Sequence, residues 1–320
     1  MPLPELKLIE RIRRSSNRGG NITRNNSRGG VQAGIGDDCA VLRLPRGHEA
    51  LITTDFSLEN VHFRRAWHPP DSVGHRCLAR GLSDIAAMGG EPVAAFLSLA
   101  LPRDVRQRWV DEFLRGLLRL AKRFGLTLAG GDTAQSPDGI LADIVVLGSV
   151  PAGEAVLRSG ARAGDAIYVT GQLGGAATVL HRLQAGKRIR ARDFPGHFYP
   201  TPRLEVGRYL REHGLATAMI DISDGLSTDL SHICEESRVG ARIVGTEIPA
   251  ASRAILSLAL HGGDDYELLF TAPAKMRVPN TIAGVSVTRI GDIIRGRGVR
   301  LVQNGSEKKL AAGGWQHFKG

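Results

Sequence analysis

Aspartates recur in this chain beside glycine, serine or threonine, at the ends of expected strands or the starts of expected helices. The segments are GIGDDC (Asp37, Asp38), ITTDF (Asp55), LSDIAAMGG (Asp84), AGGDT (Asp132), IDISDG (Asp221, Asp224) and GGDDYEL (Asp264, Asp265). One such aspartate on its own is usually a turn residue or a helix cap. Carboxylates that converge repel one another unless cations lie between them. Six such segments in one chain therefore favour a fold that gathers them around bound cations.

The ligand types point to magnesium. Carboxylates with threonine or serine hydroxyls are hard oxygen ligands, which Mg²⁺ prefers. The chain has no GxxxxGK[ST] loop, no protein-kinase motif set and no GxGxxG after a strand. Lysine is absent from every acidic segment, so in phosphoryl transfer metal ions would neutralise the charge, with arginine and glycine-loop amides assisting. At this point a metal-binding protein without catalysis stays open as an alternative.

Helical and strand patterns alternate along the chain, which predicts an α/β or α+β protein with two domains, 1–150 and 151–320. Helices are expected over 1–14, 72–88, 104–124, 174–185, about 203–213 and 225–237, and strands over 39–44, 50–56, 93–101, 126–130, 140–149, 166–171 and 217–221. Residues 15–31 have the composition of a loop. Pro151 and Gly153 open the connector between the two domains.

Composition excludes several classes of function. Hydrophobic residues make up 42% of the 320 residues, enough for a sizeable core, and aromatic residues only 5%, which argues against stacking platforms for single-stranded nucleic acid. The net charge of +10 comes from scattered arginines, and anionic small substrates or a bias in base composition explain it as well as nucleic acid does. No apolar run approaches the roughly 20 residues of a span, so a membrane is not expected as a partner. Nucleic acid is not expected as the main partner either, because the basic residues are scattered and aromatic residues are few. The N-terminus lacks a secretory apolar core, so a cytoplasmic location is expected.

The three cysteines are Cys39, Cys77 and Cys234, and they form no CxxC pair. This spacing fits reduced, buried thiols better than a disulfide framework or a zinc site. No covalent nucleophile is expected among them.

Seven segments in order resemble the thiamine-monophosphate kinase family. They are GIGDDCAVL, TTDFSLENVHF, LSDIAAMGG, AGGDT, LRSGARAGDAIYVTG, IDISDGLSTDL and GGDDYELLF. Each is weak alone, but the seven together are specific, and TTDFSLENVHF separates this family from its relatives in purine synthesis. The superfamily also contains selenophosphate synthetase, which would need a reactive cysteine in an N-terminal glycine-rich loop, and a hydrogenase maturation protein, which would end in a cysteine. This chain ends in GGWQHFKG.

The resemblance implies a two-domain fold of the aminoimidazole ribonucleotide synthetase type. Its N-terminal domain would bind ATP and Mg²⁺ and would form a homodimer through a β-sheet or barrel-like interface. A C-terminal α/β domain would complete the site in the cleft between the domains. The implied reaction is direct transfer of the γ-phosphoryl group of ATP to thiamine monophosphate, with no phosphoenzyme.

The resemblance also implies site residues. The metal ligands would be Asp38, Thr53, Thr54, Asp55, Asp84, Asp132, Asp221 and Asp224, with the threonines offering a hydroxyl or carbonyl oxygen. ATP would contact Gly131, Asp132, Arg158 and Ser223, and thiamine monophosphate would contact His62, Asp264 and Trp315. Asp37 is interpreted as a turn residue that orients Asp38. The family usually has glutamate where this chain has Asp264.

Two alternatives stay open from the sequence. The first keeps the superfamily and changes the reaction to an ATP-dependent synthetase acting on a ribonucleotide amide. The second is a protein that binds a nucleotide or thiamine phosphate without catalysis.

Overall fold

The computed structural model describes residues 1–17, 30–36 and 38–318, which divide into two compact units. Unit 1 consists of Met1–Ile85, Gly90–Gly153 and Phe198–Pro200. Unit 2 consists of Ala86–Gly89, Glu154–His197 and Thr201–Gly320. Most of the loop expected over 15–31 lies outside the described residues, as does Asp37.

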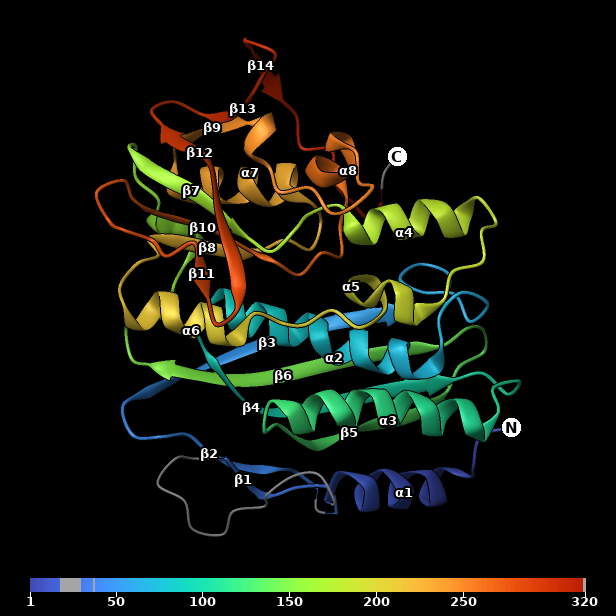
Figure 1. Ribbon diagram of the computed structural model, residues 1–320. Helices are drawn as coiled ribbons and strands as arrows, with labels where there is room; N and C mark the ends of the chain where they lie inside the picture. Colours follow the sequence, from blue (N-terminus) through green and yellow to red (C-terminus); the bar gives the residue numbers. More distant parts are fainter. Residues whose placement is uncertain (18–29, 37, 319–320) are drawn as a thin grey trace. The chain divides into compact units, whose positions relative to one another are not determined.

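Unit 1 is built on a four-stranded sheet in the order β3-β6-β4-β5 (Figure 1). The strands are β3 (His48–Leu58), β6 (Leu141–Pro151), β4 (Glu91–Leu101) and β5 (Thr127–Gln135). Only β4 and β5 run parallel, and α3 (Gln107–Arg123) is the crossover between them. A further helix, α1 (Glu5–Asn17), and a two-stranded sheet of β1 (Gly30–Ala33) and β2 (Val41–Arg43) complete the unit.

One face of this sheet is covered by α2 (Pro70–Ala87) and α3 (Figure 1). The helical period of α3 places Phe113, Leu117 and Leu120 in the core, while Arg115 and Arg119 are exposed. The side chains of β3 alternate between the two faces, and Ile52 and Phe56 on the uncovered face are 70% and 54% exposed. A sheet with one covered and one open face follows from this alternation.

Unit 2 contains a larger, mostly antiparallel sheet in the order β14-β13-β9-β12-β7-β10-β8, with β11 paired to β12. The strands are β7 (Asp165–Thr170), β8 (Ala218–Asp221), β9 (Gly240–Val244), β10 (Leu268–Pro273), β11 (Thr281–Ile282), β12 (Val285–Ile294), β13 (Gly298–Gln303) and β14 (Ser306–Leu310). The helices are α4 (Gly175–Gln184), α5 (Pro195–Phe198, whose last residue belongs to unit 1), α6 (Leu204–Glu212), α7 (Leu226–Ser237) and α8 (Leu256–His261). The core of the unit joins α7 to the sheet through side chains such as Leu230, Ile233, Ile220 and Val169.

The expected α/β class and most expected elements are confirmed. The helix expected over 1–14 lies at Glu5–Asn17, and Ser16 near its end donates a hydrogen bond to the Leu128 carbonyl in β5, at 2.5 Å. The strand β9 was not expected, since its five residues carry only a short apolar alternation. Among the described helices none has the length and apolarity that a membrane crossing requires.

The burial expected for the cysteines holds for two of the three. Cys77 and Cys234 are buried, and burial raises the pKa of each thiol to about 12. Cys39 is exposed, so its predicted burial is wrong. It follows Asp38 at the edge of the two-stranded β1–β2 sheet, where no core covers it.

Candidate functional site

In unit 1 the side chains of Thr53 and Asp84 meet between β3 and α2. The Thr53 hydroxyl donates a hydrogen bond to the Asp84 carboxylate. Asp55 lies two residues after Thr53 in β3, so its side chain lies on the same, helix-covered face. Three oxygen-bearing side chains of the predicted metal set are thus gathered on one face of the sheet.

The close approach of α2 to the sheet depends on Gly81. A Cβ at this position would lie 2.6 Å from Cγ2 of Val146 in β6 and 3.6 Å from Cγ2 of Thr53. Asp84 is one helical turn further along α2. The absence of a side chain at Gly81 therefore brings Asp84 within reach of Thr53.

Thr54 points to the opposite face of the sheet. Its hydroxyl donates to Asp143 in β6 at 2.7 Å. The side chains of Thr53 and Thr54 therefore lie on opposite faces of the sheet. Of the hydroxyl or carbonyl oxygen expected from each threonine, the Thr54 hydroxyl is directed away from Asp55 and Asp84. Sequence reasoning missed Asp143, although a carboxylate inside the apolar run LADIVVLG was a signal.

Asp132 in β5 is exposed and accepts the Thr133 amide at 2.8 Å. The register pairs Asp132 with Ser98 of β4, and Ser98 with Asp143 of β6. Gly131 pairs with Leu97 and is also exposed. The segment AGGDT thus lies in the edge strand β5, and the register places Asp132 in one row with Ser98, Asp143 and Phe56, on the open face of the sheet and opposite to Thr53 and Asp55.

Asp38 is exposed, just before β2. The guanidinium group of Arg13 in α1 lies against Gly36, two residues earlier. This arginine is a cation beside the GIGDD segment that sequence reasoning did not single out.

His62 follows β3 in a tight loop. The Leu58 amide donates to Nδ1 of His62 at 3.0 Å, and the His62 amide donates to the Leu58 carbonyl at 2.9 Å. Because Nδ1 accepts a hydrogen bond, the neutral ring carries its proton on Nε2. His62 is therefore held in the tautomer that offers an Nε2–H donor.

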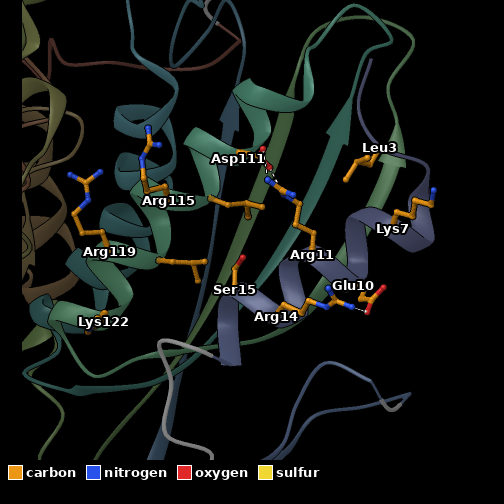
Figure 2. A pocket seen from close by; sticks show the side chains of 12 residues that line it. Leu3, Lys7, Glu10, Arg11, Arg14, Ser15, Asp111, Arg115, Arg119 and Lys122 are labelled. Carbon is orange, nitrogen blue, oxygen red and sulfur yellow. Dashed lines mark hydrogen bonds and ion pairs between the residues drawn. The ribbon is translucent and has the colours of Figure 1, made fainter.

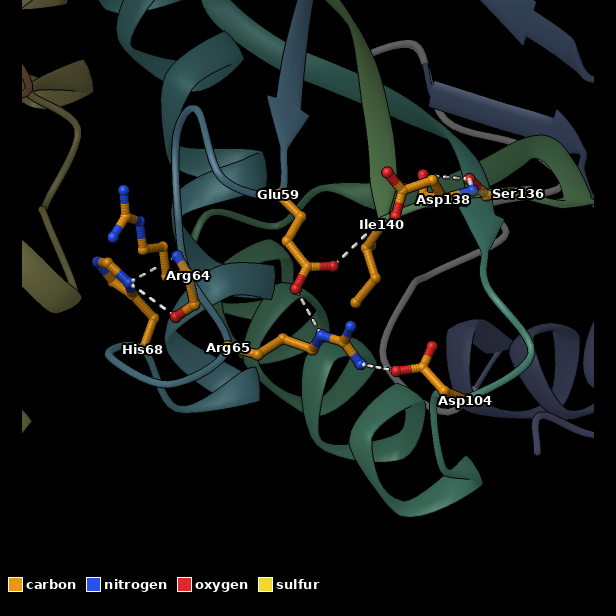
Figure 3. A network of polar contacts seen from close by, with 8 residues as sticks. All are labelled: Glu59, Arg64, Arg65, His68, Asp104, Ser136, Asp138 and Ile140. Atoms are coloured by element: carbon orange, nitrogen blue, oxygen red, sulfur yellow. Dashed lines mark hydrogen bonds and ion pairs between the residues drawn. The ribbon is translucent and has the colours of Figure 1, made fainter.

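The loop that carries His62 is tied to its surroundings by a polar network around Glu59 (Figure 3). Glu59 accepts hydrogen bonds from Nε of Arg65 at 2.5 Å and from the Ile140 amide at 3.0 Å. Arg65 also donates to Asp104 at 2.8 Å. Hydrogen bonds to these two carboxylates raise the pKa of Arg65 above its ordinary value. The network fixes the two ends of the loop that flanks His62.

In unit 2 the segment IDISDG passes from the end of β8 to the start of α7. Asp221 is buried at the end of β8, while Ser223 and Asp224 are half-buried in the turn. Asp229, in the first turns of α7, accepts the amides of Asp224 at 3.2 Å and Gly225 at 3.0 Å. A buried carboxylate thus holds the turn that carries two predicted site residues.

Asp224, Asp229 and His232 form a cluster whose candidate ligand atoms all lie within 4.8 Å of one another. Burial, followed by the charge of Asp224, raises the pKa of Asp229 to about 7. Sequence reasoning missed Asp229 and His232, although their spacing of three residues on a helix places them on one face. The cluster combines two carboxylates with an imidazole.

Asp264 and Trp315, the residues predicted to bind thiamine monophosphate, are both hydrogen-bonded to this turn. The Asp264 amide donates to the Ser223 carbonyl at 2.8 Å, and the Trp315 amide donates to the Asp224 carbonyl at 3.0 Å. Oδ1 of Asp264 accepts the Tyr266 hydroxyl at 2.6 Å. The Trp315 side chain is 52% exposed. Unit 2 therefore brings Ser223, Asp224, Asp264 and Trp315 together.

The remaining acidic residues of GGDDYEL have structural partners. Asp265 accepts the amides of Gly174 at 2.6 Å and Ala176 at 3.3 Å, at the N-terminus of α4. Burial raises its pKa to about 7. Glu267 is buried, forms a two-point ion pair with Arg203 and accepts the Thr170 hydroxyl at 2.6 Å. These contacts fix the strand that follows Asp264.

Arg158 begins a short 3-10 helix, Arg158–Gly160, and is exposed. Its carbonyl accepts the Ser237 hydroxyl at 2.7 Å. The backbone of Arg158 is thus attached to the end of α7.

A separate groove of about 720 Å³ lies between α1 and α3 in unit 1 (Figure 2). Six cationic side chains line it: Lys7, Arg11, Arg14, Arg115, Arg119 and Lys122. Each of the four arginines faces a carboxylate, namely Asp111, Glu10, Glu112 or Asp71. The groove shares no residue with the predicted site, and its positive charge is largely neutralised.

Comparison with known proteins gives the family. Residues 36–150 match the model of the AIR synthase related protein, N-terminal domain, and residues 162–310 match that of the C-terminal domain. The thiamine-monophosphate kinase of Escherichia coli (strain K12) is 39% identical over 310 residues, which cover 91% of this chain and 94% of that protein. The chain belongs to the thiamine-monophosphate kinase family.

Solved structures of the family have the same fold. The thiamine-monophosphate kinase of Stenotrophomonas maltophilia K279a superposes with a TM-score of 0.81 at 34% identity, covering 96% of this chain and 99% of that one. A second structure, "AaThiL complexed with AMPPCP and TMP", has a TM-score of 0.77 at 31% identity and covers 85% and 88% of the two chains. The two-domain fold expected from the sequence is confirmed.

Gly81→Ala tests the approach of α2 to the sheet. The added methyl group overlaps Val146, so α2 must shift and Asp84 moves away from Thr53. We expect a loss of stability of about 1–3 kcal/mol and a fall in turnover of at least about tenfold, equivalent to about 1.4 kcal/mol in the barrier. Gly196→Ala, where a Cβ meets nothing within 4 Å, is the matched control. Normal turnover in Gly81→Ala would contradict this role.

Asp265→Asn tests the burial of the Asp265 carboxyl group. As the pH rises, the unfolded state loses this proton near its ordinary pKa of about 4, whereas the native state loses it only at about 7. The stability of the wild type therefore falls through this window and stays lower above it. Relative to Asp265→Asn, we expect the unfolding free energy of the wild type to fall on the order of 2 kcal/mol between about pH 4.5 and 7.5. Urea denaturation at both pH values measures this, and a difference independent of pH would contradict it.

Proposed function

We propose that this protein transfers the γ-phosphoryl group of ATP directly to the phosphate of thiamine monophosphate, giving thiamine diphosphate and ADP. The observation that carries the proposal is identity of 39% over nine-tenths of the chain to a thiamine-monophosphate kinase. The structure of a relative with AMPPCP and TMP supports the same pair of substrates. Cytoplasm, where ATP is abundant, is the proposed location.

The donor set fits Mg²⁺. Unit 1 carries the side-chain oxygens of Asp38, Thr53, Asp55 and Asp84, and that of Asp132 in a row on the open face of the sheet. Unit 2 carries those of Asp221 and Asp224. The Thr53–Asp84 contact shows that oxygen donors come within hydrogen-bonding distance of one another, and oxygen donors are what Mg²⁺ prefers. When bound, Mg²⁺ neutralises the charge that the phosphate oxygens develop during transfer.

The residues of the chain bind and orient the two substrates in this proposal. Ser223, Arg158 and the exposed backbone at Gly131 contact the nucleotide. His62 contacts the phosphate of thiamine monophosphate, while Asp264 and Trp315 hold the rest of this substrate. Two of the three thiols are poor nucleophiles, because burial raises the pKa of Cys77 and Cys234 to about 12. Positioning and charge neutralisation carry the reaction without a covalent intermediate.

The test combines protein, ATP, Mg²⁺ and thiamine monophosphate and measures thiamine diphosphate by chromatography. We expect product that depends on Mg²⁺ and disappears with a chelator. Asp84→Asn keeps the size of the side chain but removes its charge, so we expect turnover to fall at least about a hundredfold, or about 2.7 kcal/mol. Asp138→Asn, at an exposed turn of the same unit, is the matched control. Folded wild type without product would overturn the proposal, and near-normal Asp84→Asn would overturn the role of Asp84.

We also propose that the protein is a homodimer through the open face of the unit 1 sheet. Ile52 and Phe56 are exposed on this face of β3. In β6, half-buried Leu147 lies opposite Ile52, and half-buried Val145 lies opposite Thr54, between the two apolar residues. Exposed apolar side chains gathered on one sheet face are typical of an interaction surface.

Sedimentation tests the dimer. The wild type is expected to sediment at twice the 34.3 kDa chain mass, and Ile52→Glu with Phe56→Glu to sediment as a monomer, because buried unpaired charges oppose association. Leu6→Glu, at an exposed leucine of α1, is the control. A monomeric wild type would contradict the proposal.

A further inference from the structure

The segment Gly313–Trp315 is held against the start of α7 by side-chain hydroxyls. The Gly313 amide donates to Oγ of Ser227 at 3.2 Å, and the Gly314 amide donates to Oγ1 of Thr228 at 3.1 Å. The Trp315 amide then donates to the Asp224 carbonyl at 3.0 Å. Three consecutive amides of the C-terminal segment are thus bound by the turn and first residues of one helix.

The segment lies too close to α7 for a side chain. A Cβ at Gly314 would lie 2.2 Å from the Asp224 carbonyl oxygen and 2.7 Å from Oγ1 of Thr228. Ser227 is itself held on its other side, because its Oγ is 2.8 Å from Nδ1 of His261 in α8. The Gly313–Trp315 segment and the start of α7 are therefore closely packed, and hydrogen bonds hold both in place.

We propose that Ser227 and Thr228 are positioning residues for the acceptor substrate: their hydroxyls hold Gly313–Trp315 so that the Trp315 ring is set for stacking on thiamine monophosphate. This inference rests on the proposed function. The final residues of a domain fray unless they are tied down, and here the two hydroxyls hold the residues that lead into Trp315.

The two hydroxyls are expected to affect the binding of thiamine monophosphate rather than the phosphoryl-transfer step. The Trp315 ring is half exposed, and its Nε1 donates to Nε2 of the neighbouring His317 at 3.3 Å. The amide hydrogen bonds of Gly313–Trp315 anchor this exposed segment to α7. A side chain that must be ordered on binding lowers affinity, whereas a pre-organised one does not. Loss of the hydroxyls therefore weakens binding of thiamine monophosphate and leaves the ATP side, carried by the side chains of Ser223 and Asp224, unchanged.

Thr228→Val tests the proposal, because valine has the shape of threonine without its hydroxyl. We expect the KM for thiamine monophosphate to rise about fivefold, as for one neutral hydrogen bond, with the KM for ATP and kcat within about twofold. Thr228→Ser restores a hydroxyl and should restore the KM. The double variant Ser227→Ala with Thr228→Val should raise it further.

Ser231→Ala is the matched control. Its hydroxyl donates to the Ser227 carbonyl within α7, at 2.7 Å, and makes no contact with Gly313–Trp315. Calorimetric titration of each variant with thiamine monophosphate alone measures the binding step directly, and thermal unfolding shows that each variant is folded.

The outcomes separate this inference from the proposed function. A wild type that forms no thiamine diphosphate overturns the function. A wild type that forms product, with an unchanged thiamine monophosphate KM and affinity in Thr228→Val and in the double variant, overturns the positioning role. A loss of kcat or of ATP affinity equal to the loss for thiamine monophosphate overturns it as well, because that result indicates general damage to the turn.

Discussion

In unit 2, three consecutive backbone carbonyl oxygens join the turn before α7 to two other segments of the chain. They belong to Ile222, Ser223 and Asp224. They accept the amides of Tyr266, Asp264 and Trp315 at 2.9, 2.8 and 3.0 Å. The side chains of Ser223 and Asp224 are the proposed contacts of the nucleotide and the metal, and the backbone of the same residues holds Asp264 and Trp315, the proposed contacts of thiamine monophosphate. All three hydrogen bonds join backbone atoms, so they depend on the path of the chain rather than on the residue type at each position.

The turn itself is kept in place by a buried carboxyl group. Asp229 binds the amides of Asp224 and Gly225, which would otherwise be unpaired donors ahead of α7. Its high pKa shows that burial next to Asp224 disfavours the ionised form. A bound cation at Asp224 would relieve the repulsion between the two carboxylates. The proposed metal site therefore explains why the chain buries the Asp229 carboxyl group beside Asp224.

Much of the fold could be read from the sequence, and the reasons are local. The apolar period of α3 and the alternation in β3 fix which faces are buried, since 3.6-residue and 2-residue periods differ. The acidic segments were found because each stands at the end of an apolar strand or at the start of a helix. Their order along the chain carried the family resemblance.

Strand register and long-range contacts could not be predicted from the sequence. Alternation alone says that Thr53 and Thr54 face opposite ways, but only the folded sheet shows that the Thr54 hydroxyl reaches diagonally across the β3–β6 pair to Asp143, which lies opposite Phe56. The proximity of Gly313–Trp315 to Ser227 and Thr228 joins residues 86 positions apart, and no local pattern predicts it. The exposure of Cys39 likewise depends on how far the core extends, which the apolar residues after it do not reveal.

The central claim is that one turn serves both the nucleotide and the acceptor side of the site. Amide hydrogen exchange of the whole protein, with and without Mg²⁺ and a non-hydrolysable ATP analogue, tests it most directly. Binding that rigidifies the turn should slow exchange at its hydrogen-bonded partners. We predict slower exchange of the Asp264, Tyr266 and Trp315 amides on addition of the analogue, before any thiamine monophosphate is present. Unchanged exchange at all three amides, under conditions where the analogue is bound, would contradict the claim.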